Sequence, residues 1–124
     1  MEDFFYRKLK VYQRSIQLVV DVYALTKQFP SHEQFALTNQ IQRAVISVPS
    51  NIAEGMGRFS IKERIHFVEI ACGSLMETMC QLEIAANLGY ISEEQFETQD
   101  SNVSEINKML IALRKSLEDK NSKS

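Results

Sequence analysis

The sequence predicts an all-α protein, an antiparallel four-helix bundle whose chain runs up, down, up and down. Apolar residues recur every three or four positions over four long segments, which is the period of a helix with one buried face. No segment shows the alternation of a strand, and connections of roughly two to five residues place consecutive helices antiparallel. We expect helices at about 7–28, 32–56, 61–88 and 93–117, one domain over 1–117, and a flexible polar tail over 118–124.

The expected helix ends have recognisable signals. A capping box, in which a serine is followed three residues later by Glu or Gln, predicts three helix starts at 31–34, 60–63 and 92–95. Pro30 ends the first helix, because the residue before a proline is pushed out of the helical region. Pro49 predicts a bend in the second helix, and Gly55 and Gly57 predict a left-handed end to it.

Composition indicates a cytoplasmic protein without a membrane segment, metal or cofactor. The net charge is −2, and no apolar run reaches the roughly 18 residues of a membrane span. Cys72 and Cys80 are expected to lie roughly 12 Å apart on one helix, too far for a disulfide, so we interpret both as small buried residues. His32 and His66 are too far apart in sequence to form a local metal motif.

A continuous polar stripe runs along the second expected helix, and a shorter one along the third. By their helical spacing these stripes predict a structural polar network of Gln40, Arg43, Ser47, Asn51, Glu54, Glu69, Gly73 and Glu77. Folding the two helices back on each other places Arg43 near Glu77 as an ion pair, Ser47 near 71–73, and Glu54 near Arg64. The alternative is a set of solvated charges that never meet.

Two functional interpretations of the charged residues differ in strength. Glu54, Glu69 and Glu77 resemble acid/base carboxylates, but without a partner nucleophile or a Glu-x-x-His pair they do not indicate an enzyme. Arg7, Lys10 and Arg14 form a basic stripe on the first helix, which is either a solvated face or a phosphate-contacting surface. Residues 1–64 hold nine Lys/Arg against six Asp/Glu, whereas residues 65–124 hold five against ten.

Several motifs together resemble the 23S rRNA intervening-sequence proteins. They are Gln40-x-x-Arg43, Ser47-x-Pro49-x-Asn51-Ile52-Ala53-Glu54-Gly55-x-Gly57-Arg58, Ile70-Ala71-x-Gly73-Ser74-Leu75-x-Glu77, Leu9-x-Val11-Tyr12, Phe29-Pro30 and Leu88-Gly89-Tyr90. The family is similar to the accessory protein of diversity-generating retroelements, a five-membered ring of bundles that binds nucleic acid and a reverse transcriptase. The resemblance therefore implies a homopentamer and a nucleic-acid role, although the pI of 5.7 departs from a basic binder.

We therefore expect a non-enzymatic scaffold that assembles with copies of itself. Exposed aromatic residues are candidates for the subunit contact: Phe4, Phe5, Tyr6 and Phe67. The alternative for Phe4 and Phe5 is that they cover one end of the core. The alternative is an accessory protein that binds structured RNA or DNA, or a nucleic-acid enzyme, through a basic face of the ring. The residues expected to make nucleic-acid contact are Arg7, Lys10, Arg14, Arg58, Lys62 and Arg64.

Overall fold

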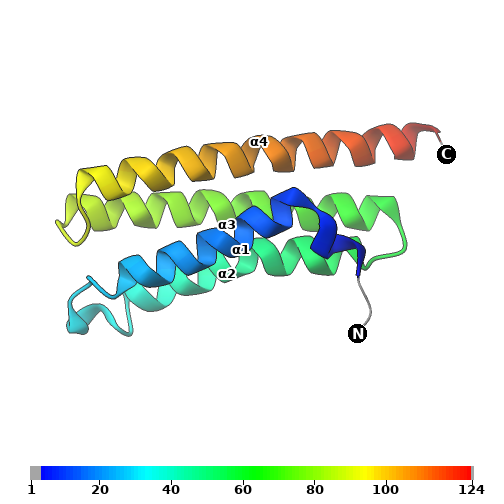
Figure 1. The fold of residues 1–124 in the computed structure, drawn as a ribbon. Helices are drawn as coiled ribbons and strands as arrows, with labels where there is room; N and C mark the ends of the chain where they lie inside the picture. Colours follow the sequence, from blue (N-terminus) through cyan, green and yellow to red (C-terminus); the bar gives the residue numbers. More distant parts are fainter. Residues whose placement is uncertain (1–3, 124) are drawn as a thin grey trace.

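The structure, a computed structural model, describes residues 4–123, and for Lys123 the backbone alone. Four α-helices form an antiparallel bundle with no strand in these residues, as the sequence predicts. The elements are η1 (Phe5–Lys8), α1 (Lys10–Thr26), η2 (Ser31–Glu33), α2 (Leu37–Met56), α3 (Ile61–Asn87) and α4 (Glu93–Lys123). Both ends of the described chain lie at the end of the bundle that holds the α2–α3 turn (Figure 1).

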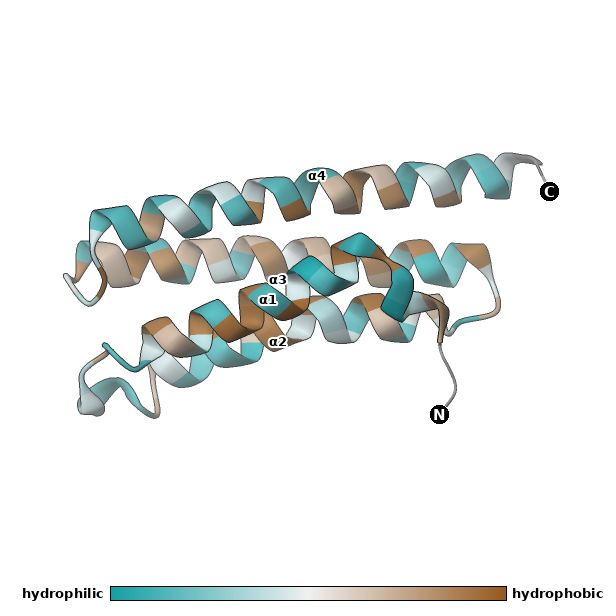
Figure 2. Ribbon diagram, viewed as in Figure 1, coloured by the Kyte–Doolittle hydropathy of each residue, from teal (hydrophilic) through white to brown (hydrophobic). Residues whose placement is uncertain are grey.

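One hydrophobic core runs the length of the bundle. Its fully buried side chains come from all four helices and include Leu18, Ile41, Leu75, Leu82 and Leu110. α1 packs on α2 and α4, and α3 packs on the same two helices, so α1 and α3 lie diagonally opposite each other in the bundle. Hydrophobic residues recur along every helix in Figure 2, and α4 is the most hydrophilic of the four.

The first two helices begin later than predicted. α1 starts at Lys10 rather than 7 because residues 5–8 form the separate 3₁₀ turn η1. α2 starts at Leu37 rather than 32, and the Ser31 side chain makes no capping hydrogen bond. The capping role passes to Glu33, whose Oε1 accepts the Leu37 amide at 3.4 Å. The predicted capping box at 31–34 is therefore wrong.

The two later helices begin where the capping boxes predict. Ser60 Oγ accepts the Glu63 amide at 3.0 Å, and Ser92 Oγ accepts the Gln95 amide at 3.0 Å. The Gln95 side chain also returns to the Ser92 amide at 2.9 Å, which completes the reciprocal pair. α4 continues to Lys123, so residues 118–123 extend a helix that was expected to end at 117.

The left-handed end predicted for α2 needs correction, whereas the bend at Pro49 stays a prediction. Pro49 lies inside α2, which remains one continuous helix through it. Gly55 is inside the helix, and Gly57 caps it at a φ of −85°, so neither is left-handed. Within the described residues, the glycine with positive φ is Gly89 at 78°, directly after α3. A right-handed last turn ends α2, and a left-handed glycine follows α3.

Candidate functional site

A small hydroxyl and amide cluster joins α2 to α3 near their middles. Ser74 Oγ donates to Ser47 Oγ at 2.8 Å, and Asn51 Nδ2 donates to the same oxygen at 2.8 Å. Two turns away, Gln81 Nε2 lies 3.5 Å from Gln40 Oε1. Three residues of the predicted network thus lie along the seam between these two helices. A half-buried cluster of this kind fixes the register of the two helices.

The predicted ion pair between Arg43 and Glu77 does not form. Both side chains are exposed, and no hydrogen bond or ion pair joins them in the described part of the chain. The register explains the difference, because Ser47 lies against Ser74 rather than against residues 71–73. In the register set by Ser47 with Ser74 and Gln40 with Gln81, Arg43 lies level with Thr78, and the exposed Arg43 and Glu77 side chains remain solvated.

The other predicted carboxylates pair with different partners. Glu54 binds Arg58 at 3.0 Å, four residues later in the chain, rather than Arg64. Glu69 binds Arg114 of α4 at 2.9 Å. All four charged groups of these pairs are about half exposed, so each pair contributes only about 0–1 kcal/mol. The stripes of α2 and α3 therefore form a short polar seam with separate surface pairs beside it.

Gly55 and Gly73 have opposite surroundings. A Cβ at Gly55 would lie 2.6 Å from the Cβ of Phe67, so only glycine lets α2 and α3 approach this closely. Phe67 is half-buried against this site, and the Arg58 guanidinium lies 4.7 Å above its ring centroid. Gly73 is exposed, and a Cβ there would meet nothing within 4 Å. Phe67, expected at a subunit contact, is thus largely used within the subunit.

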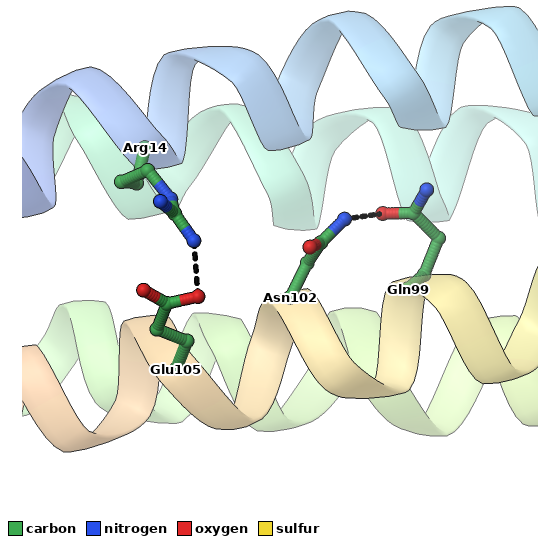
Figure 3. Close-up of polar contacts among 4 residues, drawn as sticks. All are labelled: Arg14, Gln99, Asn102 and Glu105. Atoms are coloured by element: carbon green, nitrogen blue, oxygen red, sulfur yellow. Dashed lines mark hydrogen bonds and ion pairs between the residues drawn. The ribbon is translucent and has the colours of Figure 1, made fainter.

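Several of the predicted nucleic-acid residues are engaged within the chain. Arg14 of α1 forms an ion pair with Glu105 of α4 (Figure 3). The Arg64 Nε donates to the Arg58 carbonyl at 2.7 Å, and the Arg7 guanidinium lies 5.4 Å from the Phe4 ring centroid. The two remaining candidates, Lys10 and Lys62, have exposed side chains.

Sequence reasoning missed a polar seam between α1 and α4. Beside the Arg14 pair, Asn102 Nδ2 donates to Gln99 Oε1 at 3.3 Å, as Figure 3 shows, and Gln99 Nε2 lies 3.5 Å from Asp21 Oδ2. Gln99 is buried, whereas Asn102 is half-buried. These residues follow no motif. The sequence feature that could have revealed this seam is the presence of polar residues on the inner face of α4. Buried polar groups need hydrogen-bond partners, so such residues indicate polar contacts with a neighbouring helix.

The two ends of the bundle differ in charge. The end with η1 and the α2–α3 turn carries both signs with cations in excess: Arg7, Lys8, Lys10, Arg58, Lys62, Arg64, Arg114, Lys115 and Lys120, beside Glu54, Glu63, Glu69, Glu118 and Asp119. The opposite end, with η2 and the α3–α4 turn, is acidic: Glu33, Glu83, Glu93, Glu94, Glu97 and Asp100, beside Lys27. We call these the basic end and the acidic end. The antiparallel fold concentrates charge that is dispersed in the sequence.

An apolar groove, which we call the α1–α2 groove, lies on the outer side of these two helices. Two adjoining hollows of about 280 and 480 Å³ make it up, and both contain Val19 and Ile46. Its other main side chains are Tyr12, Ile16, Val20, Tyr23, Pro49 and Ala53. Val20 is 55% exposed and Ile46 is 41% exposed, although both are aliphatic. The exposed aliphatic side chains of the two helices therefore form a contiguous apolar surface.

A second exposed apolar stripe, the α3 stripe, follows the outer side of α3. Ile70, Met76, Ile84 and Leu88 are all at least one-third exposed, and Cys80 lies among them. At 100° per residue, Gly73 falls in the middle of this stripe, and the exposed Glu69 and Glu77 fall on the same face, so the stripe holds two carboxylates among its apolar side chains. The stripe is separate from the α1–α2 groove, since α3 lies diagonally across from α1.

Other sequence predictions concern the cysteines and the N-terminal aromatic residues. Cys72 is half-buried, and burial raises the pKa of its thiol, but Cys80 is exposed, contrary to expectation. Phe4 and Phe5 are exposed, while Tyr6 packs edge-on against Tyr12 with ring centroids 4.9 Å apart. Within the described residues no group of three or more His, Cys, Asp or Glu side chains is placed to hold a metal ion. None of the helices searched in that range combines the length and apolarity needed to cross a bilayer.

At the acidic end a half-buried hydrogen bond ties the loop before α2 to the α3–α4 turn. Tyr90 Oη donates to Glu33 Oε2 at 2.7 Å. This hydrogen bond, followed by that from the Leu37 amide, holds the pKa of Glu33 below its ordinary value. The same contact raises the pKa of Tyr90.

Replacing Tyr90 by Phe should raise the pKa of Glu33 toward its ordinary value, because the largest cause of the shift is removed. A lowered folded-state pKa stabilises the fold above the unfolded pKa, and this stabilisation is lost as the pH falls through the folded pKa. The acid limb of unfolding should therefore be shallower in Tyr90→Phe. Carboxyl NMR titration and acid unfolding measure both effects, with Tyr23→Phe as the control. An unchanged pKa of Glu33 would contradict this assignment.

Comparison with known proteins gives a consistent result. The family model described as 23S rRNA-intervening sequence protein matches residues 7–112. The chain is also similar to a solved structure of a protein with unknown function from the S23 ribosomal protein family from Bacteroides thetaiotaomicron VPI-5482, with 31% identity and a TM-score of 0.78. The match covers 85% of this chain and 98% of that one. A comparison with curated proteins found no match.

Proposed function

The chain belongs to the 23S rRNA-intervening sequence protein family, and we propose that it is a non-enzymatic cytoplasmic scaffold that assembles into a homopentameric ring. The observation that carries this proposal is the α1–α2 groove, an apolar surface left uncovered by the chain itself. Removing exposed apolar surface from water lowers the free energy, so such a surface favours binding of a partner that covers it. The partner we propose is a second copy of this chain.

Two separate apolar surfaces on one subunit favour a ring. A contact in which the α1–α2 groove of one copy receives the α3 stripe of the next is heterologous, and heterologous contacts repeat until they close. Gly73 supports this pairing, because its missing side chain leaves room on the α3 stripe for another helix. The number five rests on the similarity to the ring-forming accessory protein.

A charge placed in the α1–α2 groove should disassemble the ring. Ile46→Glu puts a carboxylate where an apolar side chain would be buried, and burial of an unpaired charge is costly. We expect this variant to sediment as a monomer with an unchanged helical CD spectrum. The matched control is Ile111→Glu, because Ile111 is also exposed but lies on α4 and lines neither hollow of the α1–α2 groove. Equal effects of the two substitutions would contradict the proposed interface.

The charge asymmetry of the bundle favours a second candidate, binding of RNA or DNA at the basic end. In a ring whose bundles run along its axis, the basic ends would share one face, which gives a local cationic surface on an acidic protein. Phe59 at this end is completely exposed and Phe5 is 60% exposed, and exposed aromatic rings beside cations suit stacking with single-stranded bases.

Loss of Lys10 and Lys62 should weaken such binding for all sequences alike. The double variant Lys10→Glu/Lys62→Glu should reduce the slope of log affinity against log salt by about one per contacting lysine. Lys27→Glu at the acidic end is the control and should leave the slope unchanged. Binding of structured or single-stranded RNA over a salt series measures this, and no binding at low salt would refute the candidate.

A further inference from the structure

A pocket at the acidic end adjoins the α3 stripe, since Glu83 and Asn87 line both this pocket and a hollow on that stripe. It lies between α3 and α4, has a volume of about 550 Å³, and contains Met79, Ala86 and Phe96 as its apolar part. Glu83, Glu93 and Asp100 also line it. These three carboxylates are exposed and have no hydrogen bond or ion pair from any residue between 4 and 123. The pocket therefore suits an apolar group that has cations beside it.

The opposite end of the same molecule presents such a group. Phe59 in the α2–α3 turn is 100% exposed, with Arg58 before it and Lys62 shortly after it. An apolar residue directly before a helix N-cap usually packs on the fourth residue of the helix, but that residue is Arg64, and Phe59 does not cover it. The exposure of Phe59 is therefore not accounted for by capping of α3.

We propose that the acidic pocket is a docking site for the α2–α3 turn of a second copy of this chain. The Phe59 ring enters between Met79 and Phe96, and Lys62 lies beside Glu93 at the rim. We choose a second copy as the occupant because of charge complementarity. The chain itself has the acidic pocket at one end of the bundle and the exposed aromatic ring with its neighbouring cations at the other (Figure 1).

This contact differs from the one that closes the proposed ring. The ring uses the sides of the bundle, whereas this contact joins the basic end of one copy to the acidic end of another. Where bundles run along the ring axis, it stacks one ring on the next, and because it is heterologous it leaves a free turn and a free pocket at the two ends of a stack. It requires no ring, so it also applies to the Ile46→Glu variant.

Sedimentation velocity of the nuclease-treated full chain tests the proposal. In about 0.1 M NaCl we expect species larger than the ring, and in about 1 M NaCl, where the Debye length falls to about 3 Å, we expect the ring alone. Phe59→Ser removes the docking group and Glu93→Lys reverses charge at the pocket. Each should lower the association constant by about tenfold or more.

Matched controls are available for both substitutions. Phe35→Ser removes a different exposed aromatic residue, 88% exposed, which belongs to the loop before α2 and does not line the pocket. Glu94→Lys makes the same charge change in the same first turn of α4 without lining the pocket. Both controls should associate as the unmodified chain does. Mixing Phe59→Ser with Glu93→Lys should restore one contact and stop at a pair of units, since the first keeps its pocket and the second keeps its turn.

Three results would overturn the proposal. The first is a chain that forms nothing beyond its lateral assembly in about 0.1 M salt. The second is loss of association in the two controls to the same extent as in Phe59→Ser and Glu93→Lys. The third is large species that disappear on nuclease treatment, because nucleic acid would then bridge the subunits. Repeating the series in the Ile46→Glu background distinguishes failure of this proposal from failure of the proposed ring. End-to-end association should persist in that background even without a ring.

Discussion

Gly55→Ala should destabilise the fold, whereas Gly73→Ala should stabilise the isolated subunit. At Gly55 the new Cβ would lie 2.6 Å from the Cβ of Phe67, so α2 and α3 must move apart. Overpacking of this kind costs about 1–3 kcal/mol, and the better helix propensity of alanine offsets at most about 1 kcal/mol of it. At Gly73 no atom lies within 4 Å, so only the propensity gain remains.

Chemical denaturation of the two glycine variants measures the difference directly. Both substitutions add one methyl group within a helix, so the difference between their free energies of unfolding isolates the close approach at Phe67. The comparison should be made in the Ile46→Glu background, where ring assembly does not contribute to stability. Equal stabilisation by both variants would show that α2 and α3 are not held as closely as the structure describes.

Gln81→Met should stabilise the protein by about 1–3 kcal/mol. Gln81 is buried, and its Oε1 has no hydrogen-bond partner in the described residues, which leaves a desolvated acceptor. Its Nε2 is 3.5 Å from Gln40 Oε1, a long contact whose loss has little cost. Methionine has a similar length and helix propensity, so it fills the same space without the unsatisfied oxygen.

Gln99→Met is the matched control for Gln81→Met. Gln99 is also a buried glutamine, on α4, but its Oε1 accepts from Asn102 at 3.3 Å. Its replacement leaves the Asn102 amide without that partner and should destabilise the fold by about 1 kcal/mol. Thermal or urea unfolding of the two variants checks the opposite signs. A destabilised Gln81→Met would mean that its buried oxygen has a partner in solution.

The helix pattern predicted the fold because each core face repeats at the helical period over many turns. The 60–63 and 92–95 capping boxes also located their helix starts, since a serine side chain acts on an amide three residues away. The box at 31–34 failed because Glu33 reaches both the Leu37 amide and Tyr90, a residue distant in sequence. The capping-box motif therefore predicted the helix starts that depend on contacts between residues close in sequence.

The sequence predicted the position of the polar stripe on α2 better than it predicted which residues the stripe contacts. Ser47 and Asn51 do lie on the seam with α3, but the pairing of Arg43 with Glu77 failed after a small shift in register. Register depends on packing at sites such as Gly55 and Phe67, which periodicity does not reveal. The charge asymmetry of the two ends likewise emerges only after antiparallel folding brings separate segments together.

The central claim, a ring assembled through the α1–α2 groove, is tested most directly by the mass of the nuclease-treated protein in solution. Sedimentation equilibrium in about 1 M NaCl suppresses contacts between charged ends while leaving apolar contacts intact. We predict a mass five times that of the 14.3 kDa chain, constant over the micromolar concentration range. A mass equal to a single chain throughout that range would contradict the account.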